Sequence, residues 1–169
     1  EDFVRLAQQQ VPRMFPSLDS PDYTSIIDVR SFQRLLGALD EARERGARIV
    51  PLLPGPAFDA ASRKIAPHLV LDAPADCALM RREIFGPILP LRGYRSLDEV
   101  IAAVNAGDRP LAVYPFSHDK AVIQRVLDHV MSGGVSVNDA LMHVGQHDLP
   151  FGGVGPSGMG HYHGREGFE

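Results

Sequence analysis

The sequence has one cysteine and no long uninterrupted run of apolar residues. A single cysteine cannot form an internal disulfide, which excludes a disulfide-stapled scaffold and is typical of a reducing compartment. No stretch approaches the roughly 18–20 apolar residues that a membrane-spanning helix needs, and no signal peptide is recognisable. We therefore expect a soluble, cytoplasmic protein without a membrane span.

An excess of basic residues is also absent. The 17 Lys and Arg residues are interspersed with 21 Asp and Glu residues, and the net charge is −4. Because nucleic-acid-binding proteins carry a basic patch or stripe, we expect no nucleic-acid partner. With 169 residues, of which 44% are hydrophobic and 22% charged, the chain is large enough for one globular domain with an ordinary core.

Both ends of the sequence look cut. The chain begins, without a Met, inside an amphipathic pattern that predicts a helix with Phe3, Leu6, Ala7 and Val11 on one face. It stops soon after a glycine-rich run, with no final periodic element. We expect residues 1–169 to be a partial domain, truncated at both ends, so that part of its chemistry lies outside it.

Helical and extended patterns alternate between these ends. Helices are predicted over residues 31–45, after the Ser96 and Glu99 capping box, and after a Ser117 cap. The apolar runs between and after them predict strands at "RIVPLL", "HLVLD", "PILPL", "LAVYPF" and "VSVN". The prolines of "PILPL" place it at a sheet edge or strand end. This alternation predicts a layered α/β domain around a largely parallel sheet.

The glycine-rich segment near the end matches the residue pattern of a dinucleotide-binding motif but lacks the sequence context that the motif requires. Residues 153–158 satisfy G-x-G-x-x-G. That fingerprint requires a preceding strand, a following helix and an acid about 20 residues later, but here the chain ends too soon and Pro156 lies inside the loop. We expect a tight loop whose glycines let the backbone approach another surface closely.

Four histidines gather in the last quarter of the chain: His143, His147, His161 and His163. A pair such as His161 and His163 could contribute to a metal site. No cysteine lies nearby and no H-E-x-x-H motif is present. We expect these histidines to make ordinary hydrogen bonds and assign no metal.

Several phrases of the sequence are recognisable together. They are "EIFGPILPL", "SLDEVIAAVNAGDRPLAVYPFS", "SGGVSVND" and "LPFGGVGPSGMGHYHGREGF". In this order they resemble the C-terminal half of the catalytic domain of NAD(P)-dependent aldehyde dehydrogenases, and they cover most of residues 76–169. Residues 1–75 match more loosely. The segments "HYHG" and "PLAVYPFS" are similar to the corresponding segments of the fatty-aldehyde and coniferyl-aldehyde branch of that family.

The resemblance implies a fold and a function. The fold would be the three-layer αβα catalytic domain of that family, without its cofactor-binding domain. The parent enzyme would use NAD or NADP to oxidise an aldehyde, coniferyl or another aromatic or long-chain one, to the carboxylic acid. The resemblance also implies a homodimer or a larger homo-oligomer for the full-length protein.

Glu83 and Phe85 are the candidate cofactor-binding residues. From the residues alone, Glu83 is either a solvated acid beside Arg81 and Arg82 or a ligand group, and Phe85 is a core residue. The resemblance implies that Glu83 hydrogen-bonds the hydroxyls of the nicotinamide ribose and that Phe85 packs near the nicotinamide. A carboxylate suits this role because it only accepts and can take two hydroxyl donors.

No catalytic residue is assigned within the chain. The resemblance implies a nucleophilic cysteine in a G-Q-x-C motif, which we expect upstream of Glu1. That motif, the glutamate base and the asparagine oxyanion donor are absent. Cys77 follows an acid and precedes apolar residues, which favours a buried, inert thiol over a nucleophile. Residues 1–169 alone are expected to be inactive.

Two alternatives remain open at the level of sequence. The chain could be a non-catalytic interaction module derived from this domain. It could also belong to an acyl-phosphate reductase of the same superfamily, which would require a basic phosphate-binding loop. Arg165 alone gives thin support for such a loop.

Overall fold

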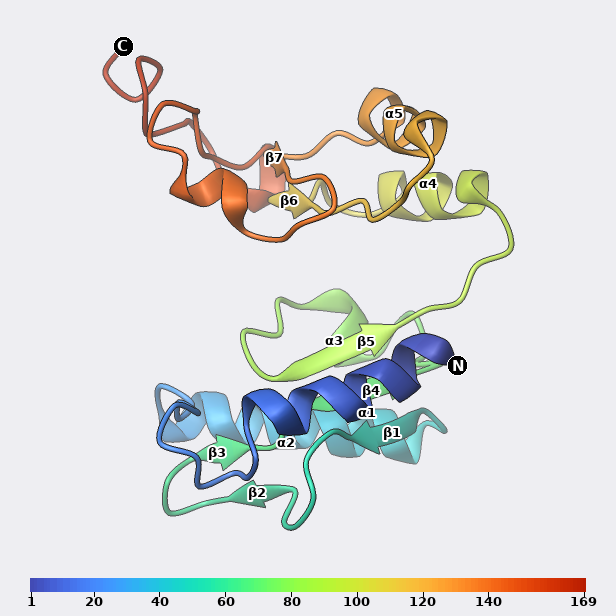
Figure 1. Ribbon diagram of the computed structural model, residues 1–169, viewed down its shortest axis with the longest axis vertical. Helices are drawn as coiled ribbons and strands as arrows, with labels where there is room; N and C mark the ends of the chain where they lie inside the picture. The colour runs from blue at the N-terminus through green and yellow to red at the C-terminus, as the bar shows by residue number, and fades with distance from the viewer. The chain divides into compact units, whose positions relative to one another are not determined.

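The computed structural model describes residues 1–169, which form two compact units, Glu1–Gly93 and Tyr94–Glu169 (Figure 1). Both units combine helices with short strands, and each contains one parallel strand pair. The α/β class predicted from the sequence is therefore confirmed. None of the helices has the length and apolar character needed to cross a membrane. The assignment of residues 1–169 to one partial domain stays a prediction.

The first unit is built around a three-stranded sheet in the order β1-β4-β5. Its elements are α1 (Asp2–Met14), α2 (Val29–Glu44), β1 (Arg48–Pro51), β2 (Phe58–Asp59), β3 (Lys64–Ile65), β4 (His68–Leu71), α3 (Ala78–Arg81) and β5 (Ile88–Leu91). The chain turns back through the β2–β3 hairpin, so β1 pairs with β4 antiparallel. It crosses over through α3, so β4 and β5 are parallel. β5 lies at the edge, as its prolines predicted.

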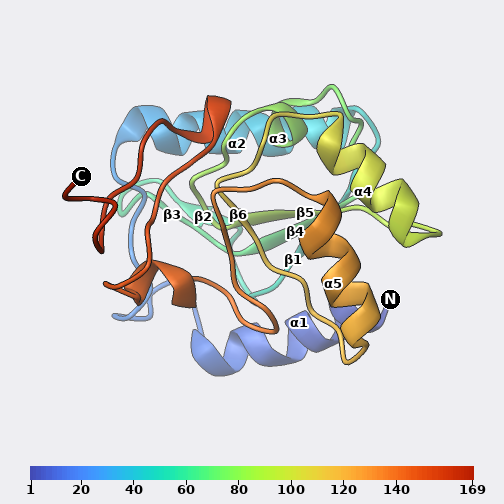
Figure 2. The same ribbon diagram turned by 90° about the horizontal axis from the view of Figure 1, so that it is seen from above.

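Helices cover both faces of this sheet. Because side chains alternate along a strand, Leu69 of β4 packs toward α1 while the adjacent Val70 packs toward α2. Figure 2 shows α1 and α2 on opposite sides of the β1-β4-β5 sheet. The α2 side holds the larger cluster, which includes Phe32, Leu35 and Ile88. The three-layer αβα arrangement expected from the resemblance is thus present in the first unit.

The helix at the start of the chain is confirmed as α1, but its predicted buried face is partly wrong. Val4 is buried, and Ala7 and Val11 pack beside it against the sheet. Phe3 and Leu6 are exposed. A helix packed on a sheet contacts it along a narrow stripe of residues at positions i, i+3 and i+7. In α1 this stripe consists of Val4, Ala7 and Val11.

Helix α2 matches the predicted helix closely at its end and begins slightly earlier. Asp28 caps its start, since the carboxylate accepts a hydrogen bond from the amide of Ser31 at 2.6 Å. Gly46 follows the last turn with φ of +89°, a conformation that glycine adopts without steric cost. Ser31 and Arg34 lie in the first two turns of α2, and both line the cavity described below.

The second unit contains α4 (Leu97–Asn105), β6 (Ala112–Val113), α5 (Lys120–His129), β7 (Gly134–Val135) and two short 3-10 turns, Met142–Gly145 and Gly155–Ser157. β6 and β7 are parallel, and both strands are shorter than the apolar runs suggested. The Ser96 cap is confirmed by a 3.2 Å hydrogen bond from the amide of Glu99. The Ser117 cap is wrong, because Asp119 caps α5 and Ser117 instead accepts from the Asp119 amide.

The glycine-rich segment forms the expected close-approach loop. Gly155 begins a single 3-10 turn at φ of +64°, and no α-helix follows it. A Cβ atom on Gly153 would lie 2.2 Å from the carbonyl oxygen of Ser157. The strand, turn and helix of a dinucleotide fingerprint are therefore not formed by residues 153–158.

Candidate functional site

The residues singled out by the sequence, Glu83 and Phe85, lie on one short loop between α3 and β5. The Glu83 side chain is exposed and makes no ion pair with Arg81 or Arg82. Phe85 has φ of +48° and is 78% exposed. The expectation from sequence alone that Phe85 belongs to the core is wrong, because the backbone turn points its ring out of the packed layer.

The backbone on the two sides of Phe85 is fixed. Arg34 of α2 donates from Nη2 to the carbonyl oxygen of Ile84 at 2.7 Å and from Nη1 to that of Glu83 at 3.3 Å. On the other side, the carbonyl oxygen of Pro87 accepts from the amide of His68 at 2.9 Å. A non-glycine residue at positive φ persists only where its surroundings hold it, and these contacts do so.

Gly86 contributes a close approach to the same loop. A Cβ atom at this position would lie 2.5 Å from Cδ1 of Leu35, a fully buried residue of α2. The absence of a side chain therefore lets the loop lie directly on the helix. Arg34 and its neighbour Leu35 thus contact consecutive parts of the loop, one by hydrogen bonds and one by packing.

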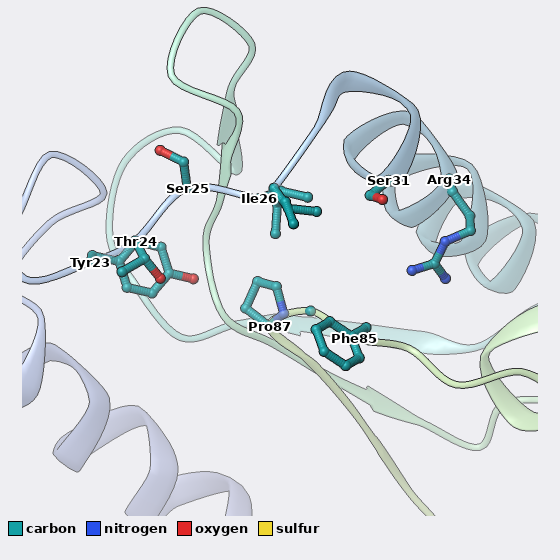
Figure 3. A pocket seen from close by; sticks show the side chains of 10 residues that line it. Tyr23, Thr24, Ser25, Ile26, Ser31, Arg34, Phe85 and Pro87 are labelled. Carbon is teal, nitrogen blue, oxygen red and sulfur yellow. The ribbon is translucent and has the colours of Figure 1, made fainter.

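A cavity of about 460 Å³ lies beside the ring of Phe85. Figure 3 shows Phe85 and Pro87 on one side of it, Ser31 and Arg34 on α2, and a segment that precedes α2 opposite them. Its lining residues are Tyr23, Thr24, Ser25, Ile26, Ile27, Ser31, Arg34, Phe85, Gly86 and Pro87. A mixture of apolar surface, hydroxyl groups and one guanidinium is suited to a small ligand that has both apolar and polar groups.

Tyr23, which lines the cavity, and Asp28, which caps the start of α2, have shifted pKa values. Burial raises the pKa of Tyr23 to about 12, and its hydroxyl donates a 2.6 Å hydrogen bond to the carbonyl oxygen of Ile65. Hydrogen bonds from Ser31 lower the pKa of Asp28, so this capping carboxylate stays ionised. Tyr23 is therefore a neutral structural anchor of the cavity wall rather than an acid or base.

The remaining candidates of the sequence lie elsewhere. Cys77 is fully buried in the cluster beneath α2 and α3, next to Leu79. In the second unit, the rings of His147 and His163 are 5.4 Å apart, and Nδ1 of His143 lies 3.1 Å from the hydroxyl of Ser136. No group of three or more His, Cys, Asp or Glu side chains is placed to hold a metal ion.

Arg34 and Ser31 were not identified from the sequence. Both stand on the polar side of an amphipathic helix, where charged and hydroxyl side chains are ordinary. Arg34 meets a loop about 50 residues later in the chain, and no local pattern encodes such a contact. Only the tertiary structure shows that these side chains share a cavity with Phe85.

The fold and this loop define a layered α/β protein with a candidate small-ligand site next to the first residues of a strand. Comparison with known proteins identifies the family. A family model described as "Aldehyde dehydrogenase family" matches residues 1–169. The chain therefore belongs to the aldehyde dehydrogenase family, and the resemblance noted from its motifs is confirmed.

Several curated proteins that are named as aldehyde dehydrogenases are similar in sequence to this chain. The chain is 52% identical to a "Probable coniferyl aldehyde dehydrogenase" of Pseudomonas aeruginosa and 50% identical to one of Caulobacter vibrioides, and it covers 35% of each. These two matches include 99% of this chain. It is 43% identical, over 89% of its length, to the "Aldehyde dehydrogenase, dimeric NADP-preferring" of Canis lupus familiaris, of which it covers 31%. The chain thus spans about a third of the length of these curated relatives.

A solved structure shows the same fold. The structure described as "Substrate bound state of Staphylococcus Aureus AldH" matches 99% of this chain with a TM-score of 0.88 and 40% identity, and the match covers 36% of that protein. The aldehyde dehydrogenase type of fold is therefore confirmed for residues 1–169.

Proposed function

We propose that this chain forms the C-terminal half of the catalytic domain of an NAD(P)-dependent aldehyde dehydrogenase that oxidises coniferyl or another aromatic aldehyde to the carboxylic acid. Family membership and the names of the relatives at 50% and 52% identity support this proposal. Since those relatives are about three times as long, the activity belongs to the complete protein.

The proposed cofactor-binding role rests on the loop between α3 and β5, which contains Glu83 and Phe85. Glu83 offers an unpaired, exposed carboxylate two residues before a ring that is exposed beside a cavity, and both are held on a fixed backbone. These residues fit a nicotinamide nucleotide: Glu83 would accept hydrogen bonds from the ribose hydroxyls, and Phe85 would pack beside the nicotinamide. When bound, NAD or NADP supplies the hydride acceptor of the oxidation. The role of this chain is to orient that acceptor.

The nucleophile of the proposed reaction lies outside this chain. A thiolate must reach the substrate, whereas Cys77 is fully buried among the side chains of the α2 cluster. The side chains of residues 1–169 would therefore orient the reactants while another segment of the complete protein attacks the aldehyde.

We also propose an oligomeric state and a cellular compartment for the complete protein. The relative from Canis lupus familiaris is named as dimeric, which supports a homodimer or a larger homo-oligomer for the complete protein. The single cysteine agrees with a reducing compartment, for which we propose the cytoplasm.

The test is an assay of the complete protein with coniferyl aldehyde, a long-chain alkanal and a short alkanal, each with NAD+ and with NADP+. We expect aldehyde-dependent reduction of at least one nucleotide, fastest with coniferyl aldehyde and independent of inorganic phosphate. An absolute requirement for phosphate would instead indicate an acyl-phosphate reductase. No nucleotide reduction with any aldehyde would contradict the proposal. Arg165 gives the reductase little support, because it pairs with Glu169 at 2.6 Å.

A further inference from the structure

Arg34 makes its only hydrogen bonds to the backbone of the loop that carries Glu83 and Phe85. Two nitrogen atoms of one planar guanidinium reach two consecutive carbonyl oxygens, those of Glu83 and Ile84. The side chain is exposed and forms no ion pair, so it contributes neither core packing nor a surface salt bridge. Its contacts serve the conformation of the loop.

One backbone angle and two packing contacts describe the rest of this turn. Phe85 has positive φ, which is unfavourable for a residue with a bulky side chain. The side chain of Ile84 packs against the α2 cluster, and Gly86 lies against Leu35. The Phe85 ring is thus exposed between two neighbours that are fixed by packing. Arg34 fixes the side of the turn that carries Glu83.

We infer that Arg34 is a positioning residue for the nicotinamide nucleotide, acting through the backbone carbonyls of Glu83 and Ile84. By fixing these two carbonyls it sets the directions in which the Glu83 carboxylate and the Phe85 ring project. This inference rests on the proposed function, because it assumes that the loop binds the cofactor. It adds a residue that the sequence did not reveal and that need not touch the ligand.

The chemistry of arginine suits this role better than that of lysine. A guanidinium presents several donors in a rigid plane, so two parallel hydrogen bonds fix the orientation of the acceptor pair. A lysine ammonium is a compact charge on a flexible stem and would reach one carbonyl at a time. Arg34→Lys should therefore preserve the charge and part of the function, whereas Arg34→Gln is too short to reach either carbonyl.

The test uses the complete protein and two measurements. The first is the rate at which chymotrypsin cleaves after Phe85 in the absence of nucleotide, which reports how often the loop opens. The second is the dissociation constant of NAD+ or NADP+, whichever binds more tightly, measured by calorimetry. Arg30→Gln is the matched control, because Arg30 lies one turn earlier on α2 and makes no hydrogen bond to the loop.

For Arg34→Gln we expect cleavage after Phe85 and the nucleotide dissociation constant each to rise about tenfold, as for loss of hydrogen bonds from a charged donor. The urea midpoint and the KM for the aldehyde should stay unchanged. Arg34→Lys should fall between wild type and Arg34→Gln, and Arg30→Gln should match wild type. Unchanged cleavage would overturn the inference whatever the loop binds.

The nucleotide measurement separates this inference from the proposed function. If Arg34→Gln opens the loop without weakening nucleotide binding while Glu83→Gln does weaken it, only the positioning role of Arg34 is overturned. If neither variant weakens nucleotide binding, the cofactor role of the loop fails, and the inference fails with it.

Discussion

Gly86 rests on Leu35 so closely that a single added carbon would lie 2.5 Å from Cδ1 of the leucine. Leu35 is fully buried at the centre of the α2 cluster and cannot move aside without disturbing its neighbours. The packing of one core side chain is therefore joined directly to the loop that carries Glu83 and Phe85. This contact connects the stability of the first unit to the geometry of the site.

Gly86→Ala should destabilise the protein and shift the loop. Insertion of a methyl group into a well-packed contact typically costs about 1–3 kcal/mol. We expect a lower urea midpoint together with weaker nucleotide binding. Gly37→Ala is the control, since a Cβ at this exposed position of α2 meets nothing within 4 Å. That substitution should raise stability by about 0.5–1 kcal/mol, as for glycine replacement inside a helix. Equal stability of the two variants would contradict the close contact.

His68 should make stability depend on pH in the acid range. Burial in the central strand β4 lowers the pKa of this histidine from its ordinary value of 6.5, and its Nδ1 lies 2.6 Å from the carbonyl oxygen of Ala66. As the pH falls below 6.5, the unfolded chain therefore takes up a proton on His68 before the folded chain does. The free energy of unfolding should decline from that point until the folded-state pKa is passed.

The measurement for His68 is urea unfolding between pH 5 and pH 8. In His68→Asn the amide can still donate to the carbonyl of Ala66, but nothing titrates at this site. The variant should be less stable than wild type at neutral pH and should show a shallower decline toward acid pH. An equally steep decline in the variant would assign the pH dependence to other groups.

Cys77→Ser should leave turnover of the complete protein nearly unchanged. The thiol is fully buried in the α2 cluster, so the substitution replaces a small apolar group by a hydroxyl that must lose its hydration. We expect a stability loss of about 1–3 kcal/mol and an intact acyl-enzyme burst. A fall in turnover by orders of magnitude with the fold retained would identify Cys77 as the nucleophile.

The sequence predicted the features that are local or that depend on recognisable motifs. The α2 helix, the strands at β1, β4 and β5 and the Ser96 cap follow from periodicity and capping residues within a short window. Glu83 and Phe85 were found through a motif. The order of several such motifs along the chain also indicated the family, and the match over residues 1–169 confirms it.

The errors and omissions involve choices that tertiary contacts decide. Position 4 rather than position 3 of α1 meets the sheet, and Asp119 rather than Ser117 caps α5, although either residue could do so by local rules. Arg34 was missed because an exposed arginine on a helix is ordinary until the distant loop is placed beside it. The exposed ring of Phe85 follows from a positive φ that no propensity of phenylalanine suggests.

The cofactor role of Glu83 is the central claim, and the dissociation constant of the preferred nucleotide for Glu83→Gln in the complete protein tests it most directly. The substitution keeps the size of the side chain and removes the charge that strengthens hydrogen bonds from the ribose hydroxyls. We predict binding weaker by about 1–3 kcal/mol with an unchanged urea midpoint, while Glu44→Gln, at an exposed position of α2, binds like wild type. Wild-type nucleotide affinity in a folded Glu83→Gln variant would contradict the account.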